Sequence, residues 1–187
     1  MTIRPRERRR RLQWAPYLFG KPGQGGADTS QIHATVTIDT PVEKVLEFVD
    51  DPVILAKCAP TVVRVVEVGR SERRVGNSCR VTCRVLGIPF NEEFTVIGFE
   101  PPRRHTPHRR FQISQTFHGP VKGTFTWTLE AEGNQTYASL DAAYQLMGGV
   151  FGRVLDALLI ERAVKKDVDQ MLENMKRHLA GQTMLIR

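Results

Sequence analysis

A long amphipathic segment lies near the end of the chain. Between residues 150 and 180 there is no proline, and apolar residues recur at spacings of mostly three and four, the periodicity of a helix with one buried face. These residues are Phe151, Val154, Leu155, Leu158, Val164, Val168, Met171, Leu172, Met175 and Leu179. Gly181 suits the C-terminal cap of this helix. The pattern predicts one helix of roughly 45 Å, at about 1.5 Å per residue, lying on an apolar surface.

The preceding segments alternate apolar and polar residues with a period of two, which is typical of half-buried strands. In the first of them Ile32, Ala34, Val36 and Ile38 share one face, and His33 lies on the other, exposed face. We expect seven strands, at residues 31–38, 62–68, 75–86, 90–99, 109–117, 122–130 and 137–146. Short turns with glycine or proline join the last six strands, so neighbouring strands are expected to be antiparallel.

Two short helices are expected between the first two strands. Thr40, Pro41 and Glu43 form a capping-box pattern with proline at the first helical position. Asp51 and the proline after it start a second helix, which must stop before Pro60. The predicted fold is α+β: a seven-stranded antiparallel sheet wrapped around the long C-terminal helix, with two short helices after the first strand.

Composition limits the organisation of the chain. Its 187 residues, 41% of them hydrophobic, suffice for one domain with a sizeable core. We assign residues 1–30 to a basic tail and glycine-rich linker, residues 31–180 to a ligand-binding domain, and residues 181–187 to a C-terminal tail. Neither a long apolar run nor a secretory signal occurs, so a cytoplasmic location is expected.

The distribution of charge and the spacing of the cysteines argue against a nucleic-acid-binding domain and against a disulfide or zinc site. The tail carries seven of the Arg and Lys residues against two acids, so most of the net charge of +7 belongs to it and not to a nucleic-acid-binding face of the domain. This tail is a candidate contact for a membrane surface or an acidic partner. Cys79 and Cys83 lie on one strand about 13 Å apart, too far for a disulfide or one zinc ion, and are expected to be buried free thiols.

The expected inner face of the sheet is apolar and rich in aromatic residues. Such a wall between a sheet and one helix is suited to enclosing a cavity for a hydrophobic ligand. The candidate ligand contacts are Phe94, Phe111, Phe117, Phe125, Trp127, Leu140, Leu158 and Met171.

Three polar residues share that face. Glu92 has the parity of Phe90 and Phe94, so burial would raise its pKa toward the range useful for acid–base chemistry, whereas a slip of one residue would turn it to solvent. Gln115 and Tyr144 are candidates for hydrogen bonds to a ligand oxygen. His105 and His108 lack further ligands nearby, so neither a metal nor a cofactor is expected.

Several motifs carry a family resemblance over residues 31–180. They are Val-Thr-Ile-Asp-Thr-Pro-Val-Glu-Lys-Val at 36–45, Asp-Asp-Pro at 50–52, Gly-Phe-Glu-Pro-Pro-Arg-Arg at 98–104, and Tyr144 followed by Gly148 and Gly149. With the order of elements, they resemble the helix-grip fold of the START-like (SRPBCC) superfamily, in its polyketide cyclase and dehydratase branch. Residues 51–60 are also similar to a family of carbon monoxide dehydrogenase subunits, in which a glycine usually follows where this chain has Thr61. The resemblance implies a lipid, quinone or polyketide ligand.

Three functions follow from these observations. The first is binding or transport of a hydrophobic small molecule between sheet and helix. The second is a polyketide cyclase or aromatase with Glu92 as base and Tyr144 as acid. The third is an accessory factor that docks through its tail and shuttles a quinone. Oligomeric state and ligand identity are not fixed by the sequence, and no serine-hydrolase elbow, phosphate loop or zinc-protease motif occurs.

Overall fold

The computed structural model describes residues 29–71, 74–102, 109–146 and 157–184. Ten elements follow one another in these residues: β1 (Ser30–Ile38), α2 (Val42–Asp50), α3 (Pro52–Ala56), β2 (Val62–Gly69), β3 (Ser78–Val85), β4 (Ile88–Glu100), β5 (Arg110–His118), β6 (Val121–Glu132), β7 (Gln135–Leu146) and α4 (Ala157–Met184). The predicted order and type of every one of these elements is confirmed.

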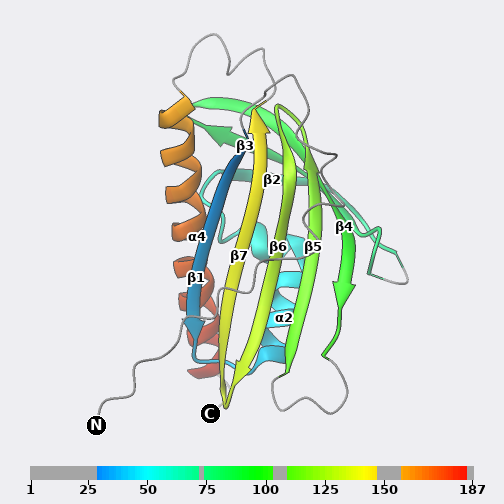
Figure 1. The fold of residues 1–187 in the computed structure, drawn as a ribbon, viewed down its shortest axis with the longest axis vertical. Coiled ribbons are helices and arrows are strands. Elements are labelled where there is room, and N and C mark those ends of the chain that lie inside the picture. The colour runs from blue at the N-terminus through cyan, green and yellow to red at the C-terminus, as the bar shows by residue number, and fades with distance from the viewer. Residues whose placement is uncertain (1–28, 72–73, 103–108, 147–156, 185–187) are drawn as a thin grey trace.

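The seven strands form one antiparallel sheet in the order β1-β7-β6-β5-β4-β3-β2. It curves strongly, with α4 running along β1 and α2 behind the central strands (Figure 1). The chain thus encloses the space between the concave face of the sheet and its helices, as the helix-grip prediction requires.

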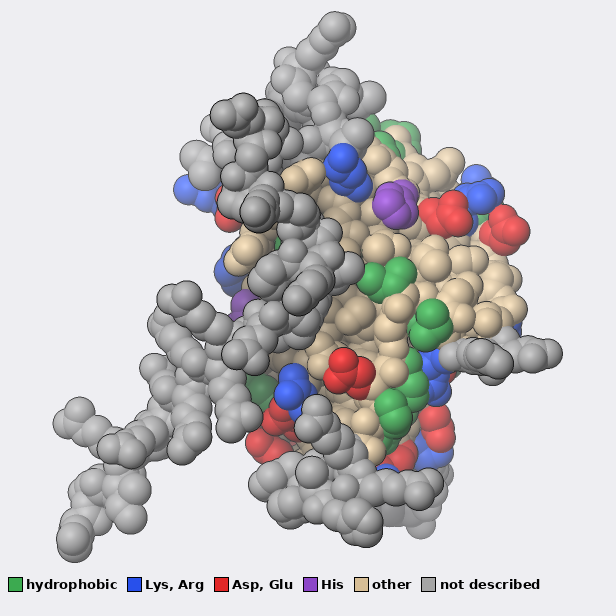
Figure 2. Space-filling view, turned by 45° about the vertical axis from the view of Figure 1, so that its right-hand side comes forward, with side chains coloured by type: hydrophobic (Ala, Val, Ile, Leu, Met, Phe, Trp, Pro, Cys, Tyr) green, Lys and Arg blue, Asp and Glu red, His purple; other side chains and the backbone are tan. Residues whose placement is uncertain are grey.

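The outer face of the sheet has a different character. Its central strands place hydroxyl side chains outward, among them Ser114 and Thr126, whose oxygen atoms lie 3.1 Å apart. Uncharged side chains and backbone make up much of the face seen in Figure 2. The apolar residues of the alternating strands therefore point to the inner side, where the core and the candidate site lie.

Two hydrophobic clusters lie on the inner side. The larger joins α2 and the second half of α4 to strands β1, β5, β6 and β7, and it includes Val45, Trp127, Leu129 and Met175. The smaller consists of Cys79, Val81 and Cys83 on β3, with side chains of β2 and β4 packed against them. The sheet is thus closely packed at one end and more sparsely filled at the other.

The expected helix signals were wrong at two positions. The Thr40 side chain caps nothing, and α2 begins at Val42 with Pro41 as its N-cap. Instead, the Thr40 backbone oxygen accepts a hydrogen bond of 2.7 Å from the Thr136 hydroxyl, which fixes this turn to the sheet. Gly181 does not end α4, which continues to Met184 because a helical glycine costs only about 1 kcal/mol.

Irregularities on two strands shift the alternation. β4 carries a bulge between Val96 and Gly98, so that Phe99 pairs with Ile113 and returns to the inner side. β2 has two such shifts, and its half-buried residues Val62 and Val65 are therefore three positions apart. These bulges bend the edge of the sheet where the candidate site lies.

Arg74 fixes the β2–β3 connection. It has a φ of 64°, an unusual conformation for a residue with a side chain. Its guanidinium lies 4.2 Å from the centre of the Phe99 ring and its Nε 2.9 Å from Asp50 at the end of α2. These two contacts hold the loop against the helix and the bulged strand.

Candidate ligand-binding cavity

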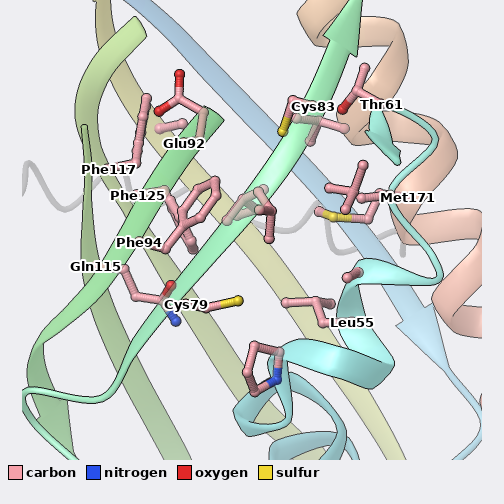
Figure 3. Close-up of a pocket in the computed structure, with 18 of the residues that line it drawn as sticks. Leu55, Thr61, Cys79, Cys83, Glu92, Phe94, Gln115, Phe117, Phe125 and Met171 are labelled. Carbon is pink, nitrogen blue, oxygen red and sulfur yellow. The ribbon is translucent and has the colours of Figure 1, made fainter. Parts of the chain in front are cut away.

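A cavity of about 270 Å³ lies between the inner face of the sheet, where each of the seven strands contributes to the lining, and helices α3 and α4. This volume is near the lower end of the range for small-molecule sites. Leu55 of α3, Cys79 of β3 and Met171 of α4 face it from three directions (Figure 3). The lining is mostly apolar, as the inner-face alternation predicts.

Strand register determines which residues of β3 and β4 reach this space. Cys83 pairs with Phe90, Val81 with Glu92, and Cys79 with Phe94. Residues opposite each other in an antiparallel pair point to the same face, so Glu92 lies on the same side as these apolar neighbours. The predicted parity of Glu92 is thereby confirmed.

Three phenylalanines form the wall next to Glu92. The ring centres of Phe94 and Phe117 are 5.9 Å apart, as are those of Phe94 and Phe125, and Phe117 and Phe125 are separated by 6.1 Å. These separations are typical of favourable aromatic pairs. The three rings thus offer a continuous apolar surface to a flat or flexible ligand.

Glu92 is the most unusual polar residue of the cavity. Its side chain is almost fully buried, with 4% of the residue exposed. Oε1 accepts a hydrogen bond of 3.3 Å from the Val121 backbone N–H, whereas Oε2 has no partner. Burial raises the pKa of the Glu92 carboxyl from 4.5 to about 7, and the Val121 hydrogen bond opposes part of that rise.

The turn between β5 and β6 makes room for this carboxylate. A Cβ atom on Gly119 would lie 2.7 Å from Glu92 Oε2 and 2.7 Å from the backbone oxygen of Asn91. Only a residue without a side chain fits there, and the backbone N–H of Val121, two positions later, then reaches Oε1. Sequence reasoning identified this glycine only as part of a turn.

Gln115 and Tyr144 lie elsewhere in the cavity. Gln115 pairs with Val96, four positions from Glu92 on β4, so about 13 Å separates the two polar groups along the strand. In Figure 3 the labels of Phe117, Phe125 and Phe94 follow one another from Glu92 down to Gln115. Tyr144 is on β7, three strand spacings or about 14 Å from β4 along the sheet. Glu92 and Tyr144 therefore reach the cavity from different strands of the curved sheet.

Burial raises the pKa of the Tyr144 hydroxyl, and the nearby Ser30 side chain opposes part of that rise. No well-formed hydrogen bond reaches this hydroxyl. The Trp127 indole nitrogen is likewise buried without a partner. Both residues line the cavity and can donate a hydrogen bond to a ligand oxygen.

Asp167 of α4 is a cavity residue that the sequence analysis did not single out. Its two carboxylate oxygens accept hydrogen bonds from the Thr61 backbone N–H (3.0 Å) and hydroxyl (2.8 Å). Seven positions later, Asn174 donates to the Cys58 backbone oxygen at 2.8 Å. Both residues interrupt the apolar stripe of α4, which is the signal that would have identified them. Together they attach α4 to the chain between α3 and β2.

Most of the predicted ligand contacts line the cavity: Phe94, Gln115, Phe117, Phe125, Trp127, Leu140 and Met171, together with Glu92 and Tyr144. Phe111 is the exception. It lies on the expected face but pairs with Leu129 within the larger hydrophobic cluster, where α2 and the end of α4 fill the space. The side chain of Leu158 lies outside the described residues, as do His105 and His108.

The cysteines and metal ligands can be placed as well. The three cysteines are buried free thiols. Burial, with the nearby Glu92 and Asp167 carboxylates, raises the pKa of the Cys83 thiol to about 12. In the part of the chain that the structure describes, no group of three or more His, Cys, Asp and Glu side chains is arranged to hold a metal ion. None of the described helices has the length and apolar content needed to span a bilayer.

Solved structures share this architecture. A START superfamily protein from Mycobacterium smegmatis is 11% identical, with a TM-score of 0.63 over 81% of this chain and 98% of that one. The Zhui aromatase/cyclase from Streptomyces sp. R1128 is 15% identical, with a TM-score of 0.63 over 83% and 96%. The protein TTHA0849 from Thermus thermophilus is 20% identical, with a TM-score of 0.60 over 82% and 99%. At these identities the likeness establishes the fold.

The sequence itself gives the family. Among curated proteins, no match to the chain was found. Residues 29–180, however, match the family described as polyketide cyclase / dehydrase and lipid transport, which covers the whole sheet and nearly all of α4. The chain therefore belongs to the polyketide cyclase / dehydrase and lipid transport family.

Proposed function

We propose that the protein binds a hydrophobic small molecule in the cavity between its sheet and α4. The observation that carries this proposal is the lining, in which an aromatic wall surrounds a few polar atoms without partners in the protein. Burial of apolar ligand surface contributes about 25 cal/mol per Å², and the polar atoms fix the orientation of the ligand. Transport or sequestration requires no further chemistry.

Native mass spectrometry of the purified full chain tests this directly. We expect a fraction of the protein to carry an added mass that solvent extraction identifies as a hydrophobic molecule. Cys83→Phe fills part of the cavity from β3 and should remove the added mass. Arg84→Phe adds the same ring at the neighbouring, exposed position and should retain it. Equal occupancy in the two variants would contradict the assignment of the site.

A cyclase or aromatase activity is the second candidate, favoured by the Glu92 carboxyl. A pKa of about 7 suits a group that accepts and returns a proton near neutral pH. One structural relative is an aromatase/cyclase by name. Glu92→Gln should then abolish turnover of a polyketide substrate while product binding persists, and unchanged turnover would exclude Glu92 as the base.

In this second candidate the Glu92 carboxyl and the Tyr144 hydroxyl reach the cavity from strands β4 and β7, which are three strand spacings apart in the sheet. As an acid the Tyr144 hydroxyl would act on a different oxygen of the substrate. Tyr144→Phe would then lower turnover without changing the pH at which Glu92 loses its proton, which a pH–rate profile measures.

Docking through the basic tail is a separate hypothesis. Deletion of residues 1–28 should abolish partitioning onto anionic vesicles and leave ligand binding unchanged. Equal partitioning of the full and shortened chains would count against a docked accessory factor.

A further inference from the structure

The end of the cavity beside the β3–β4 turn is acidic. Glu92 approaches it from β4 and Asp167 from α4, and both carboxylates raise the pKa of Cys83, which lies on β3. Both are thus within electrostatic reach of the same sulfur atom. Asp167 already accepts two hydrogen bonds from Thr61, whereas Glu92 Oε2 is buried and accepts none.

No positive side chain among the described lining residues offsets these acids. The one Arg or Lys in that lining is Arg70. Arg70 follows Gly69, which pairs with Ser78 on β3, and Ser78 in turn pairs with Thr95 on β4. Arg70 is therefore level with the residue after Thr95, which lies four positions, or roughly 13 Å, from Glu92 along the strand direction. The lining contains four more titratable residues, all of them acids: Asp50, Cys79, Cys83 and Tyr144.

An ionised carboxylate without a counter-ion is unfavourable in such surroundings. A ligand that brings a positive charge removes this penalty, because a charge-assisted hydrogen bond to a carboxylate is about twice as strong as a neutral one. A negatively charged ligand would add repulsion at the same place. The charge of the lining therefore discriminates among hydrophobic ligands.

We propose that this cavity takes a hydrophobic amine, whose ammonium group pairs with the Glu92 carboxylate while its apolar part lies against Phe94 and Phe117. The inference rests on the function proposed above and names the class of ligand for the same site. Oε2 is the free acceptor, Oε1 is held by Val121, and the aromatic wall begins at the next inward position of β4.

The ammonium also gives the site a pH signature. An alkylammonium, like a lysine side chain, stays protonated to about pH 10, whereas Glu92 loses its proton near pH 7. The amine binds the ionised carboxylate, so its affinity rises as Glu92 ionises, and binding at about pH 6.5 releases protons. A neutral ligand that accepts a hydrogen bond from protonated Glu92 has the opposite dependence.

Calorimetric titration of the full chain with decylamine, decanol and decanoic acid tests the inference, since the three probes share one chain length and differ in head group. At about pH 8 decylamine should bind at least about tenfold more tightly than decanol, and at about pH 5.5 the ratio should fall to about two or less. Glu92→Gln should abolish the preference at pH 8. Glu93→Gln removes the same charge from the exposed face of β4 and should leave the preference intact.

The outcomes distinguish a failure of the amine inference from a failure of the proposed binding of hydrophobic molecules. Decanol binding as tightly as decylamine in the wild type, or decanoic acid binding most tightly, would overturn the amine and leave the hydrophobic site standing. Binding of none of the three would count against both. Proton release, compared between buffers of different ionisation enthalpy, is measured on the wild type alone, so the inference stays testable if Glu92→Gln folds poorly. Proton uptake instead of release would refute it.

Discussion

The Glu92 carboxyl predicts a pH dependence of stability that can be worked out from the structure. Burial raises its pKa from 4.5, its value in an exposed chain, to about 7 in the folded protein. The folded state therefore holds this proton more tightly than the unfolded state does. Its contribution to stability is fully present below about pH 4.5 and is lost as the pH rises to about 7.

The magnitude follows from the two pKa values. Each pH unit between them is worth about 1.4 kcal/mol, so ionisation of Glu92 lowers the free energy of unfolding by about 3 kcal/mol between these limits. Glu92→Gln keeps an oxygen for the Val121 N–H and never ionises. The variant should therefore gain about 3 kcal/mol on the wild type as the pH rises from about 4.5 to about 8.

Urea unfolding of wild type and variant at intervals across this range measures the difference. Glu93→Gln is the matched control, since Glu93 neighbours Glu92 but is half exposed and lies 3.6 Å from Arg80. Its difference from wild type should change by less than about 1 kcal/mol. A Glu92→Gln difference that does not change with pH, or that falls as the pH rises, would refute the burial of an unpaired carboxylate.

Two further outcomes are expected from particular contacts. Gly123→Ala should destabilise the protein by about 3 kcal/mol in urea unfolding, because the new Cβ would lie 2.2 Å from the Ala143 backbone oxygen. The control is Gly98→Ala, where the new Cβ meets only Ser114 at 3.6 Å and the cost should be less than about 1 kcal/mol. Equal effects of the two substitutions would contradict the close approach of β6 to β7. The buried thiols should not react with a water-soluble disulfide reagent at about pH 8 under native conditions, because burial raises the pKa of each; rapid labelling of the folded chain would contradict this.

The inward face of the sheet could be predicted because its strands keep strict alternation. Between Phe90 and Val96 the period is unbroken, so the parity that placed Glu92 in the cavity was reliable. Beyond Val96 the bulge inserts one residue and brings Phe99 inward, which no pattern in a single sequence reveals. Faces are therefore predictable up to the first irregularity of a strand.

Whether an inward-facing residue is packed in the core or borders the cavity was harder to predict than which face of the sheet it is on. Phe111 and Phe117 share one face of β5, and only the helices decide that the first is packed in the core while the second borders a cavity. The space for the Glu92 side chain depends on Gly119, and the attachment of α4 depends on Thr61. Gly119 and Thr61 are both distant in sequence from the residues that they contact. Such tertiary contacts have no local signature.

The two hydrophobic clusters suggest how this architecture diversifies. Some residues of the larger cluster, such as Val45 and Met175, do not line the cavity and hold α2 and α4 on the sheet. The smaller cluster on β3 faces the cavity, so under the function proposed above substitutions within it would change which molecule is bound. An evolving lineage can therefore change ligands while keeping its scaffold, consistent with one shape persisting among proteins that are only 11% to 20% identical to this chain.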